Sequence, residues 1–171
     1  GIATAVFISE IAPRWVREIL KPLVELLAGL PSVVLGFLGI LVLSPFLRVF
    51  LDLPTGLTAL AGSILLGGIA VPTIVSIAED ALDAVPRSYR EGAWALGATR
   101  WQTIWRVTLP AARSGVLTAV MLGIGRAIGE TMTVMMVTGN APVLAIKLGS
   151  IFSPVRTMTA TIAAEMGEVA G

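Results

Sequence analysis

The feature that most constrains this chain is a long stretch without a charged side chain, residues 57–77. A transmembrane helix needs about 20 consecutive apolar residues to cross the hydrocarbon core of a bilayer. Gly62, Gly67 and Gly68 lie within the stretch, and such small residues favour close packing against another helix. The stretch therefore predicts a helix that spans a membrane.

The whole chain shares this apolar character. Of its 171 residues, 56% are hydrophobic and 13% are charged, whereas soluble domains carry about 25% charged residues. Cysteine and histidine are absent, which removes disulfides, thiol nucleophiles and the usual general base and zinc ligands. The composition predicts a membrane protein, and the apolar stretches of helix length indicate an all-α, polytopic fold. We expect no catalytic residue, metal site or cofactor.

Two further stretches are long enough to span a membrane. Residues 111–138 predict one complete helix, and residues 22–51 predict a helix that is kinked or broken by Pro31, Gly36, Gly39 and Pro45. Residues 140–154 are too short to cross comfortably, so we expect them to be interfacial or re-entrant. Residues 1–8 look like the end of a spanning helix, and no span follows residues 157–171, which predicts a bundle truncated at both ends.

A cationic stretch, residues 91–110, interrupts the apolar sequence. Five arginines lie in or beside it, so it does not lie in hydrocarbon: Arg87, Arg90, Arg100, Arg106 and Arg113. Its pattern predicts one short helix that ends at Gly97 and a second through Trp101 to about Val107. By itself the stretch is consistent with an amphipathic loop whose tryptophans lie at the level of the lipid headgroups.

The spacing within this stretch resembles the loop motif of the ABC importer permeases. The family's motif is Glu-Ala-Ala, then any three residues, then Gly, then any nine residues, then Ile-x-Leu-Pro. This chain departs from the motif only at Gly92, in place of Ala, and at Val107, in place of Ile. The family's loop is a cytoplasmic pair of coupling helices that docks onto a separate ATPase subunit. The resemblance implies that residues 83–109 form this loop, and that residues at the motif positions couple it to the ATPase: Glu91, Gly92, Ala93, Gly97, Leu109 and Pro110.

The distribution of basic residues gives an orientation. With the 91–110 stretch placed inside, the predicted spans put eight basic residues inside and three outside, in agreement with the positive-inside rule. The inside residues are Arg14, Arg17, Lys21, Arg87, Arg90, Arg100, Arg106 and Arg113, and the outside ones are Arg48, Lys147 and Arg156.

The remaining basic residue, Arg126, lies within the third predicted span. Counted from Leu117 it is about 14 Å deep, near the middle of a core of ~30 Å. An arginine there costs about 2.5–3.5 kcal/mol on insertion scales. We expect Glu130 one helical turn beyond it on the same face, either as a structural ion-pair partner or beside it on the path of an oxyanion. Gly125 and Gly129 form a G-x-x-x-G pair suited to close helix contact.

The run Gly125-Arg-Ala-Ile-Gly-Glu-Thr-Met132 resembles the PstC-type membrane subunit of phosphate ABC importers, and so do residues 25–37 and 153–163. The resemblance covers nearly the whole chain. It implies a heterodimer with a PstA-type subunit, two ATPase subunits inside, a phosphate-binding protein outside, and importance of Arg126 and Glu130 for phosphate passage.

The resemblance implies one partial transmembrane permease domain over residues 1–171, of the MetI-like type I ABC importer kind, in the inner membrane of a prokaryote. No phosphate-binding P-loop motif is present, so ATP hydrolysis is expected in a partner. The alternatives are a permease for sulfate or molybdate and, more distantly, a secondary transporter or an intramembrane enzyme, for which only scattered carboxylates would be available.

Overall fold

The structure is a computed structural model that describes residues 1–141 and 151–168. Over those residues the regular elements are helices, and the only strand-like pairing is an isolated bridge between Gly139 and Val155. The chain divides into two compact units. Unit 1 comprises residues 1–29 and 70–125, and unit 2 comprises residues 30–69 and 126–171. The prediction of an all-α protein is confirmed.

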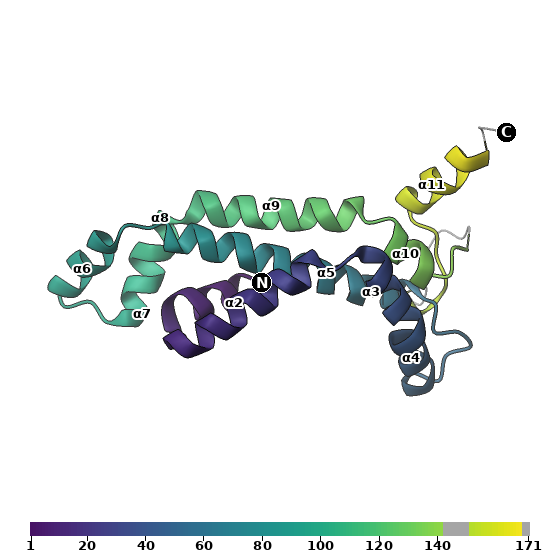
Figure 1. The fold of residues 1–171 in the computed structure, drawn as a ribbon, viewed down its shortest axis with the longest axis horizontal. Helices are drawn as coiled ribbons and strands as arrows, with labels where there is room; N and C mark the ends of the chain where they lie inside the picture. Colours follow the sequence, from purple (N-terminus) through teal and green to yellow (C-terminus); the bar gives the residue numbers. More distant parts are fainter. Residues whose placement is uncertain (142–150, 169–171) are drawn as a thin grey trace. The chain divides into compact units, whose positions relative to one another are not determined.

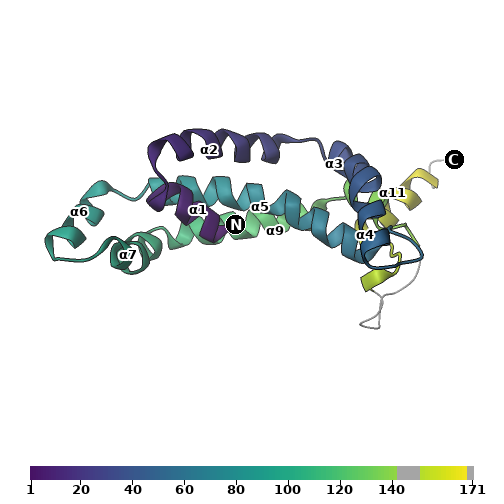
Figure 2. The same ribbon diagram turned by 90° about the horizontal axis from the view of Figure 1, so that it is seen from below.

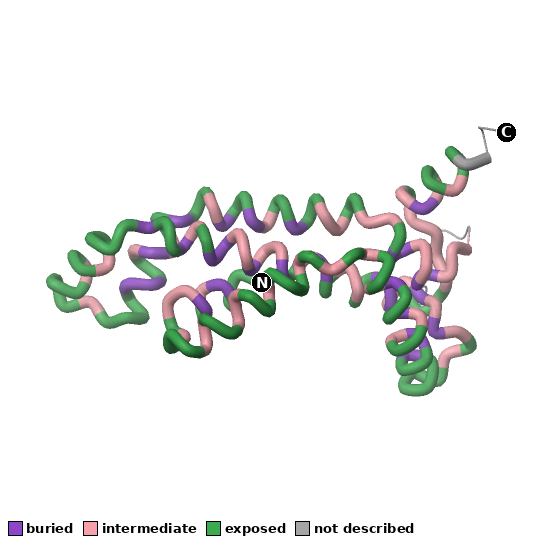
Figure 3. The backbone as a smooth tube through the Cα atoms, in the orientation of Figure 1, coloured by how far each residue is buried: buried purple, intermediate pink, exposed green. Residues whose placement is uncertain are grey.

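Unit 1 is built on two antiparallel helices, α5 (Ala59–Asp83), whose second half lies in this unit, and α9 (Arg113–Gly129). They run side by side in Figures 1 and 2. The N-terminal helix α1 (Ile2–Val6), its π-helical continuation η1 (Phe7–Ile11) and α2 (Arg14–Gly29) complete the unit. Buried positions recur where these helices face one another (Figure 3), and the core residues are Ala5, Ile8, Val75, Ala78, Leu82, Val85, Ala112, Val116 and Ala119.

Small residues on one face of α9 set its distance from α5. A Cβ atom added to Gly115 would lie 2.4 Å from Cβ of Ala81, and one added to Gly123 would lie 2.3 Å from Cγ1 of Ile74. Ala119, spaced four residues from each glycine and therefore on the same face, is fully buried. This stripe allows the two helices to approach closely.

Among the described residues, the G-x-x-x-G pair singled out from the sequence makes no such contact. A Cβ atom added to Gly125 or to Gly129 would meet no atom of the described residues within 4 Å. On α9 the close helix contact within this chain is therefore made at Gly115 and Gly123, and close contact at Gly125 and Gly129 stays a prediction.

Between α5 and α9 the chain forms a succession of short helices. These are α6 (Arg87–Ala95), α7 (Arg100–Thr103), the π-helical turn η3 (Ile104–Thr108) and α8 (Leu109–Ala111). Gly97 separates α6 from the group formed by α7, η3 and α8. Its φ is +80°, a backbone conformation that glycine adopts without steric cost. The predicted pair of short helices joined at Gly97 is therefore confirmed.

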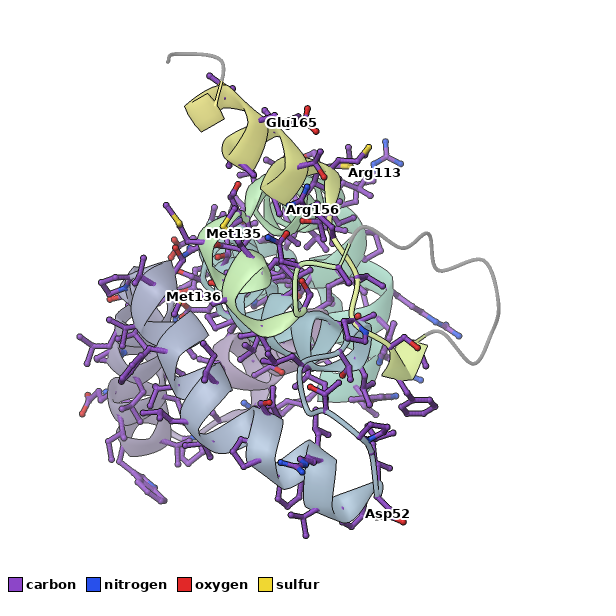
Figure 4. The ribbon with its side chains drawn as sticks, turned by 90° about the vertical axis from the view of Figure 1, so that its right-hand side faces the viewer. Asp52, Arg113, Met135, Met136, Arg156 and Glu165 are labelled. Atoms are coloured by element: carbon purple, nitrogen blue, oxygen red, sulfur yellow. The ribbon has the colours of Figure 1, made fainter. Side chains whose placement is uncertain are left out.

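Unit 2 begins with a continuous helix composed of α3 (Ser32–Leu38), η2 (Gly39–Leu43) and α4 (Ser44–Phe50). It continues with the first half of α5, α10 (Met132–Val137) and α11 (Met158–Glu168). Helix α10 packs against α3 with the Met136 side chain (labelled in Figure 4), whose sulfur would lie 2.9 Å from a Cβ atom at Gly36. Thr133 Oγ1 also donates a hydrogen bond to the carbonyl of Ser32 at 2.8 Å.

In the part of the chain that the structure describes, two helices are long and apolar enough to cross a membrane, Ser32–Phe50 and Ala59–Asp83. A third candidate is the pair 100–111 and 113–129, which is bent by 72°. The predicted break in the stretch 22–51 is present at Pro31, which has an extended ψ of 133°. The stretch 111–138 was wrongly predicted as one continuous helix, because α9 ends at Gly129 and α10 begins at Met132. The prediction for residues 140–154 falls largely outside the described residues.

Candidate functional site

The short helices between α5 and α9 expose large apolar side chains. Leu96 is 90% exposed, Trp101 is 60% exposed and Trp94 is 48% exposed. The rings of Trp101 and Trp105 contact each other edge to face, with centroids 5.8 Å apart. Exposed apolar side chains gathered on one segment are typical of a surface that binds another protein or the membrane interface.

The second group of short helices starts at a complete capping box. Thr99 Oγ1 accepts a hydrogen bond from the backbone N–H of Gln102 at 3.3 Å, and Gln102 Oε1 accepts one from the N–H of Thr99 at 2.9 Å. Two otherwise unpaired backbone donors are satisfied in this way. The spacing Thr99-x-x-Gln102 is visible in the sequence, and sequence reasoning missed it.

The base of α6 is fixed by Arg90. Its guanidinium donates to the carbonyls of Val85 at 2.8 Å and of Leu82 at 2.9 Å, near the end of α5. It also donates to Oε1 of Glu10 in η1, from Nη2 at 2.5 Å and from Nε at 3.1 Å. Arg100 of α7 reaches the backbone carbonyl of the same Glu10 at 3.5 Å. Both short helices are therefore attached to η1.

A second ionic cluster joins α2 to α5. The carboxylate of Glu79, whose side chain is 3% exposed, accepts from Arg17 at 2.8 Å and lies 2.9 Å from the ammonium of Lys21. Arg17 also pairs with Asp83, and Lys21 with Asp80 at 3.0 Å. The hydrogen bond to Glu79 raises the pKa of Lys21, because it stabilises the ammonium more than burial disfavours it.

A surface cleft of about 600 Å³ lies in unit 1 between η1, the start of α2 and the short helices. It is lined by more cations than anions: Arg14, Arg17, Arg87, Arg90 and Arg100 against Glu10, Asp83 and Glu91. Arg14 and Arg17 therefore lie at the same cleft as the arginines of the short helices. The sequence predicted that all of these residues lie on one side of the membrane. Glu91 is exposed at this cleft.

The other predicted coupling residues occupy distinct parts of the segment. Gly92 and Ala93 lie within α6, and neither Gly92 nor Gly97 has any atom of the described residues within 4 Å of an added Cβ. Leu109 is half-buried against the core of unit 1, and Pro110 follows it at the start of α8. The loop motif thus spans both the exposed end of the segment and its attachment to α9.

Arg126 and Glu130 are both half-buried. Arg126 lies in the last turn of α9, where a cation interacts favourably with the helix dipole. Glu130 lies outside the helix, because α9 ends at Gly129, and it is not one helical turn beyond Arg126 as predicted. Instead its Oε1 accepts a hydrogen bond from the backbone N–H of Thr133 at 3.2 Å, in the first turn of α10.

The chain matches the model of the family described as binding-protein-dependent transport system inner membrane component over residues 1–166. It belongs to this family, whose members are ABC importer permeases. With its apolar helices, this establishes a transport subunit in a membrane.

Among similar proteins, a probable ABC transporter permease protein YqgH of Bacillus subtilis is 50% identical over 98% of this chain and 53% of its own length. The phosphate transport system permease protein PstC of Mesorhizobium japonicum is 38% identical over 100% of this chain and 57% of its own length. The PstC of Xylella fastidiosa 9a5c is 37% identical over 96% of this chain and 56% of its own length. The chain therefore spans about half the length of the curated relatives that it matches.

Proposed function

We propose that this chain provides half of the translocation path of an ATP-driven phosphate importer and transmits the motion of a separate ATPase to that path. Phosphate is favoured over sulfate or molybdate because relatives that match nearly all of this chain are named phosphate transport permeases. The partners are then a PstA-type permease subunit, two ATPase subunits on the cytoplasmic side and an extracytoplasmic phosphate-binding protein.

We assign the coupling role to residues 83–109, within a single permease domain of residues 1–171. The observation that supports this role is the build of the segment. The segment holds two short helices at a glycine of positive φ, exposes Trp94, Leu96 and Trp101, and is anchored at its base. A segment that is firmly attached at one end and apolar at the other is suited to bind the ATPase and to transmit the motion of the ATPase to the membrane helices. Its cationic surroundings favour the cytoplasmic side.

Gly97 and Gly92 give a matched test of this coupling. In the reconstituted full-length complex, Gly97→Val introduces a β-branched side chain at φ of +80°, which distorts the turn without changing any charge. We expect ATP hydrolysis without matching phosphate uptake, or loss of ATPase binding. Gly92→Ala places the alanine of the family's motif at this position of α6, where it meets no close atom of the described residues, and it should behave as wild type. Normal coupled uptake by Gly97→Val would reject the coupling role.

We also propose that Arg126 and Glu130 act on the phosphate path. A planar guanidinium recognises an oxyanion through two parallel hydrogen bonds, which an ammonium does not reproduce. Arg126→Lys should therefore lose most phosphate uptake while the complex still assembles. Full uptake by Arg126→Lys would remove bidentate recognition, and loss of assembly by Arg126→Ala would make Arg126 a structural residue. Uptake measured with excess sulfate or molybdate separates phosphate from the alternative oxyanions.

A further inference from the structure

Arg90 is the residue through which three elements of unit 1 meet. It belongs to α6, its Nη1 and Nη2 donate to the carbonyls of Val85 and Leu82, and its Nε and Nη2 donate to Oε1 of Glu10. The planar guanidinium carries its donors in a fixed geometry. A rotation of α6 at its base therefore breaks several hydrogen bonds at once unless the end of α5 and η1 move with it.

The surroundings of this pair distinguish it from an ordinary surface ion pair. The side chains of Arg90 and Glu10 are only 15% and 11% exposed, whereas solvated pairs contribute little because water screens them. Leu82 and Val85 are also core residues. The Leu82 carbonyl lies in the last turn of α5 and also accepts from the backbone N–H of Val85 at 3.3 Å, and a cation near this helix end is favoured by the helix dipole.

Arg87 provides the contrast on the same helix. It is exposed, it lines the same cleft as Arg90, and within the described residues its side chain has no hydrogen-bond or ion-pair partner. Glu10, in contrast, is contacted from both short helices, since its carboxylate accepts from Arg90 and its carbonyl from Arg100. Attachment to η1 is therefore a property of the Arg90 position and not of arginine on α6 in general.

We propose that Arg90 and Glu10 form a positioning pair that passes the displacement of the coupling helices to the N-terminal segment η1 and α1, as well as to α5. The inference rests on the proposed coupling role of residues 83–109. Loss of the Arg90 side chain removes the hydrogen bonds from α6 to Leu82, Val85 and Glu10, whereas loss of the Glu10 carboxylate removes only the contact with η1. The ATPase then still binds and hydrolyses ATP, but less of its motion reaches the membrane helices.

The test measures ATP hydrolysed per phosphate transported by the full-length, reconstituted complex, at equal amounts of assembled complex. Arg90→Gln and Glu10→Gln should each raise this ratio roughly five- to tenfold, the range of a modest coupling free energy. The double variant should be no worse than Arg90→Gln alone, because the two residues act through one interaction. Arg87→Gln is the matched control and should leave the ratio unchanged. Arg90→Lys keeps the positive charge but loses the planar guanidinium with its fixed donors. Its ratio should therefore lie between those of wild type and Arg90→Gln.

The outcomes separate this inference from the proposed function. If Arg90→Gln and Glu10→Gln keep the wild-type ratio while Gly97→Val uncouples, the positioning pair is rejected and the coupling role stands. If Gly97→Val is itself fully coupled, the coupling role fails first. If Arg90→Gln does not assemble, Glu10→Gln decides, because it leaves Arg90 bonded to the carbonyls of Leu82 and Val85. An unchanged ratio in Glu10→Gln then overturns the inference.

Discussion

The ammonium of Lys21 lies 2.9 Å from Oε2 of Glu79, a carboxylate whose side chain is only 3% exposed. Arg17 holds the other oxygen of the same carboxylate at 2.8 Å. The two cations come from the polar face of α2 and are each about one third exposed, whereas the anion lies inside the packing of α5. The cluster is therefore asymmetric, because only the anion depends on its partners for solvation.

This asymmetry predicts that removal of the cations destabilises unit 1 more than removal of the anion. Glu79→Gln leaves two cations that water can hydrate, and we expect a loss of about 1–3 kcal/mol. The double variant Arg17→Met with Lys21→Met leaves a buried carboxylate unpaired, and we expect a loss of about 3–5 kcal/mol. Thermal unfolding of the purified complex measures both. A double variant that is as stable as Glu79→Gln would contradict the ranking.

The pKa of Lys21 predicts a loss of stability in alkali. The folded state raises this pKa above its ordinary value of 10.5, so the folded protein holds the proton more tightly than the unfolded chain. The stabilisation is therefore complete below pH 10.5 and is lost as the pH rises through the higher folded value. The thermal midpoint, followed upward from pH 9, should fall more steeply in wild type than in Lys21→Arg, whose side chain stays charged. Parallel curves for the two proteins would exclude Lys21 as the cause.

The sequence was informative where local chemistry decides the structure. The pair of short helices was predictable because glycine is favoured at positive φ and ends helices, and Gly97 has φ of +80°. The contacts that anchor the segment were not predictable in the same way. Arg90 and Glu10 are 80 positions apart, and Arg17 and Glu79 are 62 apart. Each of these side chains is equally compatible with a solvated helix face, and only the tertiary packing selects its partner.

The break after α9 was missed for a different reason. The apolar pattern continues through residues 111–138, and that pattern alone predicts an unbroken span. Gly129 is the last residue of α9 and glycine often marks the end of a helix, but Gly129 was interpreted as a packing residue. As a consequence Glu130 was placed on the face of a helix to which it does not belong.

The packing of α9 on α5 predicts opposite results for two neighbouring glycines. Gly123→Ala brings its new Cβ atom within 2.3 Å of Ile74 Cγ1 and within 3.4 Å of the carbonyl of Ala70. Overpacking of this kind costs about 1–3 kcal/mol. Gly125→Ala meets no close atom and gains helix propensity, so stability should stay equal or rise slightly. Thermal unfolding of the two variants tests this, and equal destabilisation by both would refute the assignment of the contact to Gly123.

The hydrogen bond from the Thr133 N–H to Glu130 Oε1 allows the structural and the transport role of Glu130 to be separated. Glu130→Gln keeps an oxygen that accepts this bond but removes the charge, whereas Glu130→Ala removes both. Because the bond pairs a backbone donor in the first turn of α10, Glu130→Ala should cost about 1 kcal/mol of stability, as loss of a helix cap does, and Glu130→Gln much less.

Phosphate uptake should follow a different order from stability. If the charge of Glu130 serves the phosphate path, Glu130→Gln should lose uptake as fully as Glu130→Ala, although its thermal midpoint stays near that of wild type. Uptake and thermal unfolding are measured on the same reconstituted preparations, so that misassembly is detected separately. Full uptake by Glu130→Gln together with reduced stability of Glu130→Ala would restrict Glu130 to the capping of α10 and leave Arg126 as the one candidate on the path.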